Sequence, residues 1–237
     1  MALPRPNLFG TLAQENRFVL LFISLVVFMV ASPLVKSLQN IEMTFWSNAI
    51  MAFLFMLAAI FAVSKSRSSK IIGALFTILI AALQVVQLFA EQTATLMLFH
   101  ILTVAYLGYV IILVTGYVFA QQHINANKTF ASLCVYILLG FVWALIYSFL
   151  EILQPGSFLM SFVEANNSWQ MRFGQGQSVI PLYYSLVTMT TLGYGDIIPV
   201  TDSARMFAAM QAVIGQLYIA VLVARLVAVY TSTPKQT

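Results

Sequence analysis

The chain has 237 residues, of which 61% are hydrophobic and only 8% are charged, and its mean hydropathy is +0.94. A soluble domain carries about 25% charged residues, so this composition excludes a soluble globular enzyme, a disordered tail and a coiled coil. The net charge of +4 does not indicate a nucleic-acid partner, and the single cysteine, Cys134, permits no disulfide within the chain. The composition therefore predicts an all-α protein embedded in a lipid bilayer.

Six apolar stretches without charge are long enough to cross a membrane, because a helix of about 20 residues spans the hydrocarbon layer. In chain order they cover residues 18–35, 43–64, 71–90, 96–120, 129–150 and 206–224. A seventh stretch, 173–195, is interrupted by glycine and proline and does not qualify. A cleaved signal peptide is the alternative for the first stretch, but its apolar run exceeds the usual length of about 7 to 15 residues.

The basic residues set the expected orientation, since they accumulate on the cytoplasmic side of membrane proteins. With both termini in the cytoplasm, eight of the eleven basic residues lie inside: Arg5, Arg17, Lys65, Arg67, Lys70, Lys128, Arg225 and Lys235. All acidic residues except Glu15 then lie outside. We expect a multi-pass protein of the cell membrane, with the interrupted stretch on its outer side.

The interrupted stretch ends in Ser-Leu-Val-Thr-Met-Thr-Thr-Leu-Gly-Tyr-Gly-Asp at residues 185–196. Backbone that is neither helix nor strand occurs at membrane depth only where protein or water covers it. We therefore expect a short helix over residues 181–190 followed by a re-entrant loop. Pro181 suits the first turn of this helix, where its missing N–H costs nothing, and the negative end of the helix dipole favours a cation near the membrane centre.

Residues 190–196 resemble the selectivity-filter signature of the tetrameric potassium channels, with leucine where valine is commoner. The resemblance implies that backbone carbonyl oxygens, and the Thr191 hydroxyl, replace water around K+. Gly193 and Gly195 adopt the dihedral angles that this needs without a Cβ clash. One chain carries one loop and the ring needs four, so the implied assembly is a homotetramer. The implied carbonyl ligands belong to Thr191, Leu192, Gly193 and Tyr194.

The same resemblance implies supporting residues around the loop, namely Tyr183, Tyr184, Val187, Thr190 and Asp196. The hydroxyls of Tyr183 and Tyr184 are expected to hydrogen-bond behind Tyr194, and simple packing of the two rings at the membrane interface is the alternative. Val187 stands where some family members have a carboxylate, so Asp196 lacks that partner.

Four further residues have alternative roles. Gly215 matches a glycine at which the last helix of related channels bends, or it allows close helix packing. Gln216 lines the cavity or hydrogen-bonds to another helix. His100 is a candidate pH sensor, because ionisable residues within a membrane are often functional, or a neutral ring bonded to a carbonyl. Glu151 accepts hydrogen bonds from N–H groups near Asp202, pairs with Arg205 or lies in solvent.

Six helices with the loop before the last one resemble the voltage-gated subclass, whose fourth helix is basic at every third position. Residues 92–127 contain no Lys or Arg, and each moved charge is worth about 2.3 kcal/mol per 100 mV, so we expect a pore that is not voltage-gated. The expected parts are a cytoplasmic segment 1–16, an uncharged four-helix peripheral domain 17–122, a pore domain 123–230 and a short cytoplasmic tail 231–237.

The sequence thus predicts a potassium-selective channel that conducts K+ passively and has no cofactor other than the permeant ion. An enzyme is not expected, because the predicted spans contain no carboxylate pair, nucleophile–base set or metal cluster. No soluble ligand-sensing domain is expected in this chain. The alternatives are a weakly selective cation channel, a subunit of a potassium transport system and a non-conducting modulatory subunit.

Overall fold

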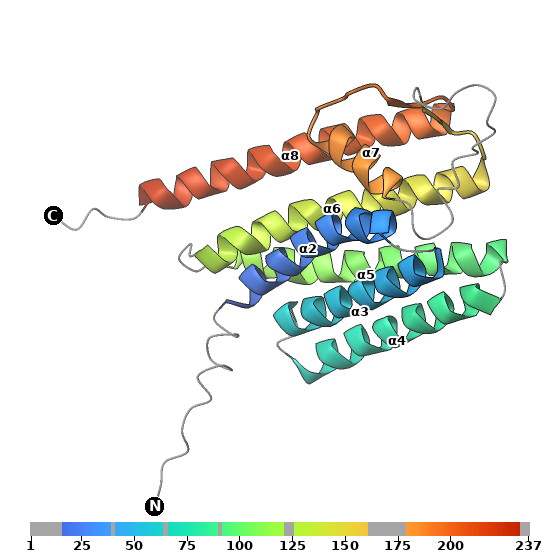
Figure 1. The fold of residues 1–237 in the computed structure, drawn as a ribbon. Coiled ribbons are helices and arrows are strands. Elements are labelled where there is room, and N and C mark those ends of the chain that lie inside the picture. The colour runs from blue at the N-terminus through green and yellow to red at the C-terminus, as the bar shows by residue number, and fades with distance from the viewer. Residues whose placement is uncertain are drawn as a thin grey trace, which may run out of the picture. The chain divides into compact units, whose positions relative to one another are not determined.

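The computed structural model describes residues 16–38, 41–63, 66–89, 92–120, 126–160 and 179–232. This part of the chain is helical apart from two short strands (Figure 1). Most of the expected terminal segments 1–16 and 231–237 lies outside the described residues. The elements are α2 (Arg17–Leu38), α3 (Ile41–Val63), α4 (Arg67–Phe89), α5 (Thr93–Phe119), α6 (Ala126–Leu153), β1 (Phe158–Met160), α7 (Ile180–Met189), β2 (Ile197–Pro199) and α8 (Asp202–Ser232).

Five of the described helices are long and apolar enough to cross a membrane, namely α2, α4, α5, α6 and α8. They coincide with five of the six expected spans. The remaining span, 43–64, coincides with α3, in which Ala49–Val63 forms a shorter apolar helix within the described residues. The chain is therefore a multi-pass membrane protein, and the sixth crossing stays a prediction.

The long helices expose many apolar side chains, as expected where lipid or another subunit covers them. On α8 the exposed side chains include Met206, Met210, Val213, Leu217 and Val221. In lipid a helix satisfies its own backbone hydrogen bonds, so these sequences form helices without needing a polar face. The apolar surface of α8 is a surface for lipid or for protein, and the sequence pattern alone does not separate the two.

The chain divides into two compact units, one of residues 1–78 with 109–135 and one of residues 79–108 with 136–237. These boundaries run through α4, α5 and α6. The expected division into a peripheral and a pore domain at residue 122 therefore stays a prediction about function.

In the first unit, the start of α2 is held by the region where α5 ends and α6 begins. The ring of Phe18 stacks on Tyr117 with centroids 4.6 Å apart, and its N–H donates to Asn127 Oδ1 over 3.1 Å. The guanidinium of Arg17 lies 4.9 Å from both ring centroids. This cation–π contact anchors a basic residue at the end of a predicted span.

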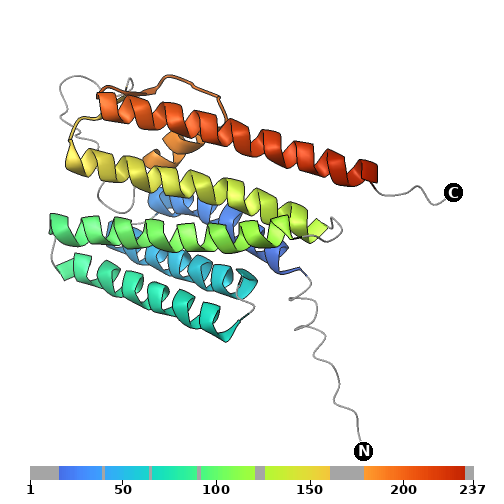
Figure 2. The ribbon, with the colours of Figure 1, turned by 180° about the vertical axis from the view of Figure 1, so that it is seen from behind.

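In the second unit, the short helix α7 packs beside α8, and both views show the two helices together (Figures 1 and 2). Strands β1 and β2 pair antiparallel, with Leu159 opposite Ile198. The Val200 N–H extends this pairing by donating to the Ser157 carbonyl over 2.9 Å. The sheet thereby ties the chain that follows α6 to the chain that precedes α8.

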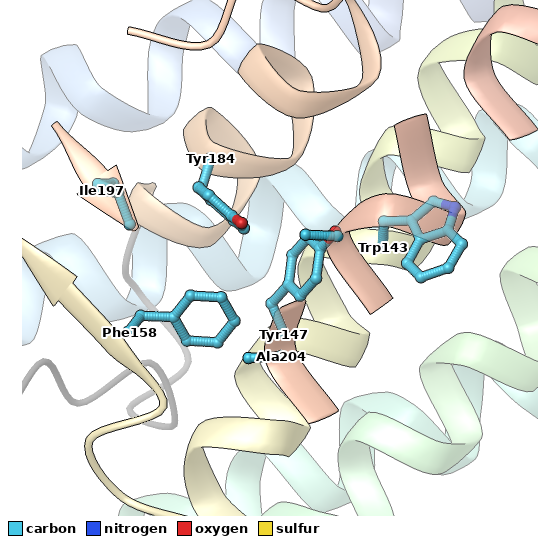
Figure 3. Packing of buried hydrophobic residues seen from close by; sticks show 7 residues of the cluster. Trp143, Tyr147, Phe158, Tyr184, Ile197 and Ala204 are labelled. Atoms are coloured by element: carbon cyan, nitrogen blue, oxygen red, sulfur yellow. The ribbon is translucent and has the colours of Figure 1, made fainter. Parts of the chain in front are cut away.

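An aromatic core joins these elements (Figure 3). The rings of Tyr147 on α6, Phe158 on β1 and Tyr184 on α7 contact one another edge to face, with centroids 4.9 to 5.5 Å apart. Trp143, Ile197, Ala204 and Ala208 complete the cluster. Because aromatic pairs of this geometry stabilise beyond the area that they bury, this core fixes the first half of α7 against its neighbours.

Candidate functional site

The expected short helix is present as α7, Ile180–Met189, with Pro181 at its start. Two glycines allow α6 and α8 to approach it closely. A Cβ at Gly140 of α6 would lie 2.9 Å from Leu186 Cδ2, and one at Gly215 of α8 would lie 2.6 Å from Met189 Cγ and 2.9 Å from the Met189 carbonyl oxygen. Gly215 is thus a close-packing position against the end of α7, while bending of α8 at this residue stays a prediction.

The loop of residues 190–196 begins by turning its amides back onto the last turn of α7. The Thr190 N–H donates to the Leu186 carbonyl over 2.9 Å, and the Leu192 N–H donates to the Val187 carbonyl over 3.0 Å. The N–H groups of residues 191 and 193 also donate to carbonyls of this turn. Val187 therefore supports the loop through its backbone oxygen, while its side chain is buried.

The loop alternates between left-handed and ordinary backbone. The φ angles of Thr191, Gly193 and Gly195 are +59°, +55° and +76°, whereas Leu192 and Tyr194 do not have positive φ. The two glycines were expected to adopt unusual angles, but the sequence reading missed Thr191, because positive φ is rare for a β-branched residue. Its hydroxyl donates to the Thr190 carbonyl over 2.6 Å.

The carbonyl oxygens of residues 191–194 receive no hydrogen bond from any residue that the structure describes. When left-handed residues alternate with ordinary ones, the amides and the carbonyls of a short segment separate onto opposite sides. Here the amides of residues 190–193 donate to carbonyls of α7, and no described residue donates to the carbonyl oxygens of residues 191–194. A set of backbone oxygens that face a common point is suited to binding a cation that has lost its water.

The two tyrosines at the start of α7 have different partners. The Tyr183 hydroxyl donates to Asp196 Oδ2 over 2.6 Å, and this bond raises the pKa of Tyr183 to about 12, so the hydroxyl remains a donor at neutral pH. Tyr184 lies in the aromatic core. The Tyr183 hydroxyl thus has a partner at Asp196, and the expectation that both hydroxyls bond behind Tyr194 stays a prediction.

A buried polar chain between α6, α7 and α8 was missed by the sequence reading. Gln211 of α8 is fully buried, and its Nε2 donates to the Ser185 carbonyl over 2.9 Å and to Ser185 Oγ over 2.7 Å. Ser185 Oγ donates to the Gly140 carbonyl over 2.7 Å, and the Tyr147 hydroxyl donates to Gln211 Oε1. A glutamine within an otherwise apolar span was the available signal for this chain of contacts.

Glu151 has partners other than the expected ones. Its carboxylate accepts hydrogen bonds from the N–H groups of Gly156 over 2.6 Å and Ser157 over 2.9 Å, and it is buried. Arg205 instead donates through Nε to the Pro199 carbonyl over 3.3 Å. The expectation of a partner near Asp202 or at Arg205 was wrong, because the turn after α6 brings its own amides back over the helix end.

Two candidates remain, His100 and Gln216. His100 is buried in α5, where Nδ1 lies 2.8 Å from the Leu96 carbonyl oxygen, as expected for a ring bonded to its own helix. Gln216 is exposed beside Gly215, and its place in a cavity stays a prediction.

Residues 132–232 match the family model of ion channels. The match includes most of α6, all of α7 and α8, and the 190–196 loop between them. A comparison with curated proteins gives no match. The part of the chain that holds the candidate site is therefore similar to ion channels.

Proposed function

We propose that this protein is a potassium-selective channel that conducts K+ passively through a homotetrameric pore. The observation that carries the proposal is the hydrogen bonding of the backbone in the 190–196 loop. The amides of residues 190–193 donate to α7, and the carbonyl oxygens of residues 191–194 have no donor within the described residues. Four such loops around an axis would offer K+ the backbone oxygens that replace its hydration shell.

The side chains of the loop support the fourfold assembly. Leu192 is 53% exposed and Tyr194 is 66% exposed in the single chain, although both are large and partly or wholly apolar. The α8 side chains from Met206 to Val221 that were named above as exposed are apolar as well. A closed ring of four subunits would cover these surfaces, with lipid covering the remainder.

The proposed channel is not voltage-gated. Helix α5, which occupies the place of the fourth predicted span, contains no Lys or Arg, so no charge of that helix moves through the field. Flux measured over a range of imposed potentials should change only with the driving force. A steep change of open probability with voltage would contradict this part of the proposal.

The main experiment is K+ flux from liposomes that contain the purified protein. Gly193→Ala should abolish selective flux, because alanine at φ +55° costs about 1 to 2 kcal/mol in each of four loops. The matched control is Gly108→Ala in α5, where a Cβ meets nothing within 4 Å. Reversal potentials with K+ and Na+ on opposite sides measure the selectivity.

Each result separates the proposed function from an alternative. Flux carried equally by K+ and Na+ would indicate a weakly selective cation channel. No flux from the wild-type protein would indicate a modulatory subunit or a part of a larger transport system. Either result would overturn the proposed function.

A further inference from the structure

The buried polar chain links α6, α7 and α8 through the side chains of Tyr147, Ser185 and Gln211. The Tyr147 hydroxyl of α6 donates to Gln211 of α8, the Gln211 amide donates to Ser185 of α7, and the Ser185 hydroxyl donates to the Gly140 carbonyl of α6. Both hydrogens of the Gln211 amide are used. The hydrogen bonds of such a buried network are strong, because no polar group in it is left without a partner.

The direction of the Gln211 amide is set by its neighbours. The Ser185 carbonyl only accepts, so the NH2 group of Gln211 must face it. The amide oxygen then faces the Tyr147 hydroxyl, which donates. A reversed amide would place two oxygens against each other, so the network has a single arrangement.

The network and the glycine contact together define a register between α7 and α8. Gln211 contacts Ser185, and four residues farther along both helices, Gly215 contacts Met189. Met189 is the last residue of α7, directly before the 190–196 loop. Apolar packing alone would allow α7 to slide or rotate, whereas directed hydrogen bonds at Ser185 fix its height and rotation.

We propose that Gln211 is a positioning residue, which holds α7 in register with α6 and α8 and thereby sets the height of the 190–196 loop. This inference rests on the proposed function, because the consequence is ion selectivity. A binding site must be held to within about 0.5 Å to keep its geometry, and the oxygens of the loop follow directly after the helix that Gln211 holds.

The test compares two substitutions of Gln211 in liposomes. Gln211→Met keeps a long unbranched side chain without donors, and Gln211→Glu keeps the acceptor for Tyr147 but loses the donor to Ser185. Both should lower the K+ to Na+ permeability ratio about tenfold or more, as expected when buried polar partners are left unpaired. Ser148→Ala is the matched control, because this buried hydroxyl of α6 donates only to its own helix, at the Ala144 carbonyl.

A double substitution tests whether the residues act as a unit. Ser185→Ala combined with Gln211→Met should reduce selectivity no further than Gln211→Met alone, since contacting residues are not additive. An additive loss, or an unchanged permeability ratio in Gln211→Met beside a selective wild type, would overturn the inference while the proposed function stands. A wild type without selective flux would overturn both.

A milder substitution serves if the Gln211 variants do not assemble. Tyr147→Phe keeps the aromatic ring and removes only the donor to Gln211. The rise in unfolding temperature on replacing Na+ by K+ reports cation binding to the folded state, and it should shrink in Tyr147→Phe but not in Ser148→Ala. An equal K+ effect in both variants would overturn the inference.

Discussion

Gly215→Ala tests whether this glycine is a packing contact or a hinge. The new Cβ would lie 2.6 Å from Met189 Cγ and 2.9 Å from the Met189 carbonyl oxygen, whereas ordinary contact begins at 3.4 Å. The side chain can rotate, but the carbonyl must move by about 0.5 Å, from 2.9 to 3.4 Å. Overpacking of this kind costs about 1 to 3 kcal/mol, and alanine returns about 0.5 to 1 kcal/mol of helix stability.

The expected net loss is therefore between about 0 and 2.5 kcal/mol, and each kcal/mol lost lowers the unfolding temperature by about 2 to 4 °C in a chain of this size. Thermal unfolding of the purified protein measures it, with Gly108→Ala as the control because nothing lies within 4 Å of its Cβ. Because the displaced carbonyl belongs to the residue before the loop, the K+ to Na+ permeability ratio should fall as well.

The same substitution in a Met189→Ala protein separates the packing role of Gly215 from a hinge role. In Met189→Ala the 2.6 Å contact with Cγ no longer exists but the 2.9 Å contact with the carbonyl oxygen remains, so Gly215→Ala should cost less there than in the wild type and still more than Gly108→Ala. The reasoning is refuted if Gly215→Ala is as stable and selective as Gly108→Ala. It is also refuted if only the open probability changes, and by the same amount in both backgrounds, because that is the behaviour of a hinge.

Two further predictions concern Tyr183 and Glu151. Tyr183 should ionise near pH 12, so its bond to Asp196 is present below its ordinary pKa of 10 and is lost as the pH rises through 12. The absorbance difference between wild type and Tyr183→Phe isolates the titration of this tyrosine. Asp196→Asn should return the pKa of Tyr183 towards 10. Glu151→Gln should cost about 1 to 3 kcal/mol of unfolding free energy, because an NH2 group then faces the N–H donors of the turn. In the same thermal assay the exposed Asp202→Asn should cost less than about 1 kcal/mol, and an equal loss in both variants would disprove the role of Glu151.

The features of the loop that depend on nearby residues were predictable. The short helix with Pro181 at its start, the turn back from Leu192 to Val187 and the left-handed glycines all involve residues within about six positions of one another. Such contacts follow from the local order of residue types. The five described spans were predictable for a related reason, since an uncharged stretch of sufficient length has no alternative to a helix in lipid.

The partners of the polar residues were decided only by the tertiary structure. Gln211 lies 26 residues from Ser185 and 64 from Tyr147, and Tyr183 is paired with Asp196. A helix that is apolar all round does not reveal from its sequence which side faces a neighbour. The rotation of each helix, and with it the meeting of Gly140, Gly215 and Gln211 around α7, follows from packing between segments far apart in the chain.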